Sequence, residues 1–230
     1  TADLVVAVSD DVADRLRAGG LPEARLQVIE NAVTVSALPG RSEARAALGL
    51  AADADVVLCL ARLIPPKRQD LLIEAWSLME GRPQLLLAGD GPARADLEEQ
   101  TRAAGLESRV RFLGDRRDVA RLLAASDVLV LPSDREGLPM TVLEAMSAGV
   151  PVVASAVGGL ATLDPDAVEL VAPHSAQALA SGVSRLLADE TRRTTMTEAA
   201  ATLIRSRFSA PVMRERYQLA YSRLGATPRQ

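Results

Sequence analysis

The sequence predicts an α/β fold in which a parallel sheet is doubly wound, with helices on both faces. Short apolar runs alternate along the chain with amphipathic segments at helical spacing. The runs are apolar at nearly every position, as expected of strands that helices cover on both faces. Gly, Pro, Asp and Asn bound these runs, as they commonly bound strands.

Eight of the apolar runs are predicted strands. They cover residues 4–8, 26–30, 56–60, 84–88, 109–113, 127–131, 151–155 and 168–171. The segment NAVTVSALPG (31–40) resembles a crossing connection, and the main sheet is predicted to begin near Val56. We therefore expect the strand and helix in the first twenty residues to belong to a different sheet.

Helices are predicted between the strands. Residues 67–79 carry a single apolar stripe formed by Leu71, Leu72, Ala75, Trp76 and Met79. Residues 93–105 end at Gly105, a typical glycine just past a helix end. Residues 118–126 and 176–189 show the same helical pattern. Residues 209–224 form a last amphipathic helix, with no strand after it.

Composition limits the function classes. The chain has 230 residues, of which 48% are hydrophobic and 24% charged, and this balance predicts a soluble globular protein. Only 2% are aromatic, the net charge is −4, and no dense basic cluster occurs, so nucleic acid is not an expected partner. No apolar run is long enough for a transmembrane segment.

The single cysteine and the first residues suggest a compartment. Cys59 lies inside an apolar run, where it can form no internal disulfide and is expected to be a core residue. The sequence TADLVVAVSDD lacks the basic head of a signal peptide. A cytoplasmic location is therefore predicted.

Four loops follow predicted strands, at the edge of a parallel sheet where ligands bind. They are residues 61–67, 89–92, 133–139 and 156–159. Taken singly, each is ordinary turn or solvent-exposed sequence, and GDGP does not complete a G-x-G-x-x-G phosphate loop. Taken together they place cations, free backbone amides and two carboxylates on one rim.

This combination suits a nucleoside diphosphate-sugar. Arg62, Lys67 and the N-terminus of a helix starting near Pro139 can bind a diphosphate. With Pro139 at the first helical position, the N–H groups of Met140 and Thr141 remain free for a ligand. Glu136 and Glu144 would lie roughly 12 Å apart if the segment between them were all helix. One carboxylate could then meet sugar hydroxyls and the other a ribose diol.

These motifs resemble those of a known family. EGLPMTVLEAMSAGVPVVAS (136–155) looks like the E-x7-E signature of retaining GT-B glycosyltransferases, specifically glycosyltransferase family 4. LARLIPPKRQDLLIEAW (60–76) is similar to the family's segment around its arginine and lysine. The matches also include VIENAV, LLLAGDGPARADLEE and RVRFLGDRRDVARLLAASDVLVLPS, and they run in family order.

The resemblance implies roles for individual residues. Arg62 and Lys67 would bind the diphosphate and stabilise the leaving nucleotide, and Glu136 would contact the donor sugar near the reacting centre. Glu144 would hold the ribose hydroxyls. The remaining implied donor-binding residues act largely through main chain, near the sugar and phosphates (Gly137, Leu138, Met140, Thr141) or the nucleobase (Gly89, Phe112, Leu113, Gly114). Retention at the anomeric carbon is also implied.

The resemblance further implies one half of a two-domain enzyme, with the active site between the halves. Residues 1–35 would be a remnant of the N-terminal domain and linker, residues 36–208 the donor-binding domain, and residues 209–230 a crossover helix. The acceptor domain would be missing, or supplied by another chain. We expect no transfer without it, self-association through the exposed terminal segments, and a peripheral membrane location through the missing domain.

Several positions depart from the family pattern. Ala61 stands where glycine usually precedes the arginine, and Arg68 stands where glycine commonly follows the lysine. Thr162 replaces a glutamate, and Ala32 replaces a glycine after the asparagine. These differences bear on donor choice and catalysis more than on the fold.

No metal or cofactor is expected. His174 is the only histidine and is predicted to lie at the surface. The pairs Asp53/Asp55 and Asp164/Asp166 mimic a metal-binding D-x-D, but both fall in predicted turns, and the cations already balance a diphosphate. A non-catalytic nucleotide-sugar-binding or scaffolding module is the main alternative to a transferase. A GT-B-fold epimerase is a third reading.

Overall fold

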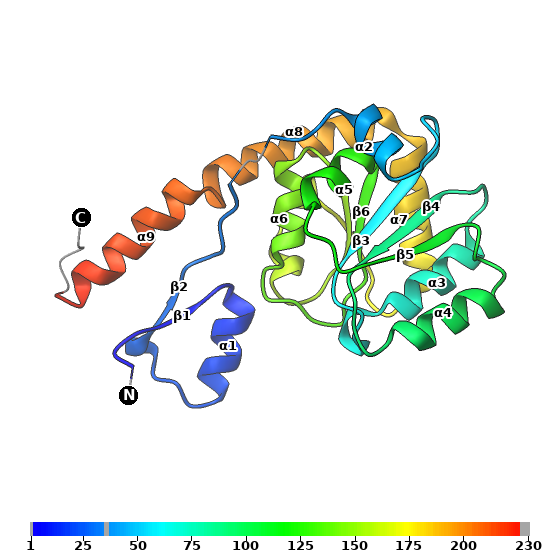
Figure 1. The fold of residues 1–230 in the computed structure, drawn as a ribbon. Helices are drawn as coiled ribbons and strands as arrows, with labels where there is room; N and C mark the ends of the chain where they lie inside the picture. The colour runs from blue at the N-terminus through cyan, green and yellow to red at the C-terminus, as the bar shows by residue number, and fades with distance from the viewer. Residues whose placement is uncertain (1, 35–36, 226–230) are drawn as a thin grey trace.

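The computed structural model describes residues 2–34 and 37–225, and its main body is the predicted doubly wound α/β domain (Figure 1). Six strands form one sheet in the order β5-β4-β3-β6-β7-β8, and all neighbours are parallel. The strands are β3 (Val56–Leu60), β4 (Gln84–Ala88), β5 (Val110–Gly114), β6 (Val128–Leu131), β7 (Val152–Ser155) and β8 (Glu169–Val171). Each agrees with a predicted strand to within one residue at either end.

The sheet is buried on both faces, which explains its continuous apolar runs. On β3, Val56 and Leu58 enter one hydrophobic core while Val57 and Cys59 enter the other. Cys59 is the predicted core residue, and its burial raises the pKa of its thiol to about 12.

Helices complete the two layers (Figure 1). On one face lie α3 (Gln69–Leu78), α4 (Arg94–Ala103) and α7 (Ala176–Ala188); on the other lie α2 (Arg41–Ala47), α5 (Val119–Ala125) and α6 (Met140–Ser147). α8 (Glu190–Arg207) contributes Met196 to the core on the first of these faces, and Ala200 and Ile204 to the core on the second. The helices expected from sequence over 67–79, 93–105, 118–126 and 176–189 are present. Gly105 has the positive φ of +66° that its predicted place past a helix end requires.

The first residues form a separate unit, as predicted. β1 (Val5–Ala7) and β2 (Leu26–Val28) pair in parallel as a two-stranded sheet, with α1 (Asp10–Ala18) and a short 3₁₀ turn, η1 (Glu23–Arg25), between them. Figure 1 shows this unit set apart from the large sheet. Its own core is small and centres on Ala7, Ala13 and Leu26.

The C-terminal helix returns toward this unit. α9 (Ala210–Arg223) follows α8 closely and extends away from the main domain (Figure 1). Glu30, just after β2, accepts hydrogen bonds from Arg207 and Arg216, and the amide of Val33 bonds the carbonyl of Phe208 at 2.9 Å. The segment after β2 is therefore joined to the end of α8 and to α9 by partly buried polar contacts.

Two helices, α2 and α8, were not expected from the sequence. α8 lacks a sharp apolar stripe because only Met196, Ala200 and Ile204 are buried along its length. The predicted helix start also shifts by one residue, because Pro139 has an extended backbone (φ −71°, ψ 128°) and caps α6 instead of beginning it. The expected boundary between residues 35 and 36 and the last five residues lie outside the described residues. The division into 1–35, 36–208 and 209–230 stays a prediction.

Candidate donor site

A cleft lies at the carboxyl ends of the central strands, beside the point where the sheet reverses its direction of winding between β3 and β6. It encloses about 610 Å³. Its walls come from the ends of β3 and β4, the loop after β5, and the first turn and a half of α6. The lining residues are Leu60, Ala61, Arg62, Ala88, Gly89, Asp90, Asp115, Arg116, Val119, Met140, Thr141 and Glu144.

Close backbone contact between two loops forms one wall of the cleft. Gly89 has φ +136°, and a Cβ there would come within 2.0 Å of the Ala61 carbonyl oxygen. A Cβ on Gly91 would come within 2.3 Å of the Leu63 carbonyl oxygen. The amide of Leu63 in turn donates to the carbonyl of Asp90 at 3.0 Å. The glycines of GDGP thus let the loop carrying Arg62 pack directly on the loop after β4.

The N-terminus of α6 forms another wall. Its cap residue Pro139 provides no side-chain hydrogen bond, and the helix's first amide bond in the described residues runs from Val142 to the Pro139 carbonyl at 3.2 Å. The N–H groups of Met140 and Thr141 therefore remain available to a ligand. Helix N-termini with free amides favour anions, and the exposed Arg62 lines the same cleft.

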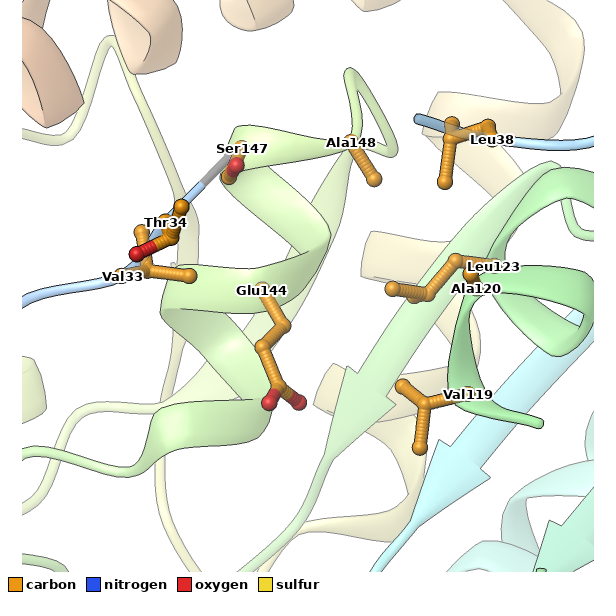
Figure 2. A pocket seen from close by; sticks show the side chains of 9 residues that line it. All are labelled: Val33, Thr34, Leu38, Val119, Ala120, Leu123, Glu144, Ser147 and Ala148. Atoms are coloured by element: carbon orange, nitrogen blue, oxygen red, sulfur yellow. The ribbon is translucent and has the colours of Figure 1, made fainter. Parts of the chain in front are cut away.

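Glu144 stands on the cleft-facing side of α6, just over one turn from its start. Figure 2 shows its side chain reaching from the helix toward the side of α5 that carries Val119. Burial raises the pKa of this half-buried carboxyl. It also borders a second, smaller cavity of about 100 Å³ between α5, α6 and the segment carrying Val33 and Thr34. A carboxylate held this way has oxygens to offer to hydroxyl groups in the cleft.

Lys67 and Glu136 meet directly. Lys67 ends the 3₁₀ turn η2 (Pro65–Lys67), and its Nζ lies 2.5 Å from Glu136 Oε1. The carboxylate side chain is only 8% exposed and the lysine side chain 24%. Neither residue is part of the cleft lining, and the two charges neutralise each other beside the cleft.

The loop that carries Glu136 is tied down on three sides. Its Asp134 amide donates to the Pro66 carbonyl at 2.9 Å, and its Leu138 carbonyl accepts from Asn31 Nδ2 at 2.9 Å. The Glu136 carbonyl accepts from the amide of Gly159, in the 3₁₀ turn η3 (Gly158–Thr162), at 3.1 Å. A Cβ on Gly159 would come within 1.7 Å of the Gly137 carbonyl oxygen, so this contact requires glycine.

The structure brings together only part of the predicted site. The cleft contains Arg62, Gly89, Met140, Thr141 and Glu144. The other predicted site residues lie outside its lining: Lys67, Phe112, Leu113, Gly114, Glu136, Gly137 and Leu138. The estimate of 12 Å between the glutamates does not apply, since helix α6 begins only at Met140.

Some of these residues have structural partners. A Cβ on Gly137 would contact Val8 and Val12 of the first unit, at 3.2 Å from each. The Gly114 carbonyl accepts from the Gly89 amide at 2.8 Å, which places the end of β5 directly behind the cleft. The loop after β5 itself, with Asp115 and Arg116, lines the cleft but was not among the site residues predicted from the sequence. The sequence GDRRD (114–118) follows a predicted strand, and this signal could have found it.

His174 lies at the surface, as the sequence predicts, and the acidic and sulfur-containing side chains can be checked for metal-binding clusters. His174 has a 59% exposed side chain, and its Nδ1 lies 3.1 Å from Asp134 Oδ1. Within residues 2–34 and 37–225, no three His, Cys, Asp or Glu side chains gather as metal ligands would. In the same part of the chain, every helix is too short or too polar to cross a bilayer.

Comparison with known proteins identifies the family. Residues 40–203 match the family model described as glycosyl transferases group 1. The chain belongs to that family. Curated relatives include D-inositol 3-phosphate glycosyltransferases of Kineococcus radiotolerans, 35% identical over 87% of this chain, and of Mycobacteroides abscessus, 34% identical over 81%. The aligned regions cover 52% and 44% of those proteins, so the chain spans about half the length of the relatives it matches.

Solved structures of glycosyltransferases share the fold. Anabaena HepE in complex with UDP-glucose has a TM-score of 0.90 and 28% identity, covering 96% of this chain and 64% of HepE. The sucrose-phosphate synthase of Thermosynechococcus elongatus has a TM-score of 0.87 and 30% identity, covering 98% of this chain and 59% of the synthase. The fold of this group 1 chain is therefore that of a GT-B glycosyltransferase, and the expectation of the GT-B class is confirmed.

Proposed function

We propose that this chain is the donor-binding half of a retaining glycosyltransferase of family 4, which moves a sugar from a nucleotide-sugar to an acceptor. One observation carries the proposal. A single cleft at the carboxyl end of the sheet combines the free amides of a helix N-terminus, an arginine and a half-buried carboxylate. The helix amides and the arginine match the diphosphate of such a donor, and the carboxylate matches its ribose.

The proposed donor lies along the cleft. Its diphosphate sits at the N–H groups of Met140 and Thr141 with Arg62 beside it, and Glu144 accepts hydrogen bonds from the ribose diol. The base then points toward the end of β5 and the loop that follows it. HepE, which has been crystallised with UDP and with UDP-glucose, shares the fold, and this supports a nucleotide-sugar as ligand.

The donor sugar extends toward Lys67 and Glu136. We expect the diphosphate to draw Lys67 from its ion pair, because a leaving diphosphate carries more charge than one carboxylate. Glu136 is then left to contact sugar hydroxyls. In the transfer step, the bond from the anomeric carbon to the β-phosphate oxygen breaks and the acceptor oxygen bonds to that carbon on the same face. The leaving phosphate takes the proton of the acceptor hydroxyl.

The acceptor site of the proposed enzyme would be formed by residues outside this 230-residue chain. The matched relatives are about twice as long, and the loop around Gly137 faces the small N-terminal unit. We therefore propose that an N-terminal acceptor domain, in the same or another chain, completes the cleft. Without it, neither acceptor positioning nor exclusion of water is available, and the 230-residue chain alone should transfer no sugar.

Calorimetric titration with a panel of nucleoside diphosphates and nucleotide-sugars tests the proposal. UDP and UDP-glucose come first, since HepE binds them. We expect dissociation constants on the order of 10 µM to 1 mM for the preferred nucleotide, unchanged by EDTA. A wild-type chain that binds no nucleotide of the panel would contradict the donor-binding function. Binding that needs Mg²⁺ would contradict the role given to the cations.

A matched assay separates a transferase from a non-catalytic nucleotide-sugar-binding module. The chain is assayed together with the proposed acceptor domain, from the same polypeptide or a second one, using the nucleotide-sugar found by calorimetry and a set of sugar and inositol phosphate acceptors. Slow donor hydrolysis and transfer support the enzyme. Tight donor binding with no hydrolysis and no transfer in the complete protein supports the binding module instead.

A further inference from the structure

Arg68 occupies an unusual place in the backbone. Its φ of +52° and ψ of 39° lie in the left-handed region, which residues with a Cβ rarely adopt. Among the described residues other than glycine, His174 is the one other residue with positive φ, at +57°. These two residues come from loops more than a hundred positions apart, yet Arg68 Nη1 lies 3.0 Å from His174 Nδ1. Backbone strain kept at two touching residues points to a contact that the fold maintains.

The guanidinium of Arg68 joins two loops. Within its own segment it binds Asp70, with Nε 3.0 Å from Oδ1 and Nη2 3.0 Å from Oδ2. Its Nη1 crosses to the loop after β6 and donates to Asp134 Oδ1 at 3.1 Å. Asp134 is also 3.1 Å from His174 Nδ1. The Arg68 side chain is 24% exposed and that of Asp134 33%, so these contacts are partly shielded from water.

The cross-link lies directly beside the ion pair of the site. Lys67 precedes Arg68, and Glu136 follows Asp134 by two residues. A second bond joins the same two loops, from the Asp134 amide to the Pro66 carbonyl. Lys67 thus lies between Pro66 and Arg68, which both bond Asp134, and Glu136 follows Asp134 by two residues. A shift of either loop would separate the groups that bind the leaving phosphate and the sugar.

We propose that Arg68 is a positioning residue for the donor site, which acts by locking the loop of Lys67 to the loop of Glu136 through Asp134. The inference rests on the proposed function, because it names what holds that site in place. Arg68 itself does not contact the ligand in the proposed site. Its planar guanidinium reaches both aspartates at once, which the ammonium group of a lysine does not reproduce.

Two isosteric variants provide the test. Asp134→Asn removes the charge that holds Arg68 to the second loop, whereas Asp70→Asn removes the charge within Arg68's own segment. Arg68→Gly deletes the whole cross-link and relieves the left-handed backbone, so its folded state should melt within about 3 °C of wild type. UDP titration by calorimetry and hydrogen exchange of the two loops without ligand are measured for all three variants.

We expect Asp134→Asn and Arg68→Gly to weaken UDP binding about three- to tenfold and to speed amide exchange in both residues 63–70 and 133–139. Asp70→Asn should change UDP affinity less than twofold. Equal losses for the Asp70 and Asp134 variants would overturn the proposal, as would wild-type affinity in Arg68→Gly.

The exchange measurement separates this inference from the proposed function. If wild type binds UDP and the loops of Arg68→Gly exchange as slowly as before, the cross-link is refuted and the donor function stands. If wild type binds no nucleotide, the donor function fails and the role of Arg68 fails with it, whatever the exchange rates.

Discussion

At the scale of single residues, Glu144 combines a cost to folding with the ribose-binding role that we propose for it. Burial raises the pKa of its carboxyl, so ionisation opposes folding at neutral pH. A group with a raised pKa in the folded state favours folding while protonated, below about its ordinary value of 4.5, and loses that contribution as pH rises through the raised value. Hydrogen bonds from a ribose diol would offset this cost in the complex.

Glu144→Gln should therefore move stability and binding in opposite directions. At pH 7 the melting temperature should rise by up to about 3 °C, since the amide carries no charge, and the difference should vanish near pH 4. UDP affinity should fall about ten- to a hundredfold, since a hydrogen bond to a charged group contributes roughly 1.5 to 3 kcal/mol. Melting curves at both pH values measure the effect on stability, and calorimetry measures the effect on UDP affinity. Unchanged UDP affinity would remove Glu144 from the ribose site.

Glu136→Gln is the matched change at the other carboxylate. Its proposed partner is the donor sugar, which UDP lacks, and the substitution also releases Lys67 from its ion pair. UDP should bind this variant as tightly as wild type or up to about threefold more tightly, whereas Lys67→Ala should lose about tenfold. UDP-glucose should bind the Glu136 variant more weakly than it binds wild type. Equal losses of UDP affinity in the Glu136 and Glu144 variants would refute the separation of their roles.

At the scale of elements, the sheet was predictable because each strand is buried on both faces and carries its own apolar run. The loops at the carboxyl ends followed from that prediction, and Arg62, Gly89, Met140, Thr141 and Glu144 indeed share the cleft. α8 was missed because only three of its side chains are buried. Its anchoring depends instead on contacts with distant residues, which no local pattern reports.

Glu30 makes one of those distant contacts and gives a prediction for the connection between β2, α8 and α9. Burial alone would raise the pKa of its carboxyl, but hydrogen bonds from Arg207 and Arg216 outweigh it and hold the pKa below its ordinary value. The ionised carboxylate therefore stabilises the fold above about pH 4.5, and this contribution is lost as pH falls through the lowered pKa.

Glu30→Gln should accordingly reduce the free energy of unfolding by about 1.5 to 3 kcal/mol at pH 7. The gap to wild type should narrow below about pH 4. Urea unfolding at pH 7 and at pH 3.5 measures both values. A gap of the same size at the two pH values would mean that the charge of Glu30 is not what holds the terminal segments together.

At the scale of the whole molecule, the sequence did not show how the predicted site residues pair with one another, and their roles stay predictions. Both Lys67 and Glu136 were expected to bind the donor, but their mutual ion pair depends on how the loops after β3 and β6 meet in space. The residues that bring those loops together, Arg68 and Asp134, have no signature in the sequence. The exposed apolar residues Leu219 and Tyr221 of α9, and Leu224 just after it, fit the neighbouring domain that we propose, but the self-association expected of the terminal segments stays a prediction.

The measurement that tests the donor-binding claim most directly is an amide NMR titration of the ¹⁵N-labelled chain with UDP. We propose that the diphosphate binds at the start of α6, so the amides of Met140 and Thr141 should show the largest chemical-shift changes, with Gly89 next. Amides at the amino-terminal ends of the strands, such as that of Val128 at the start of β6, should keep their chemical shifts. If UDP saturates the chain and the chemical shifts of the Met140 and Thr141 amides do not change, the proposed position of the diphosphate is contradicted.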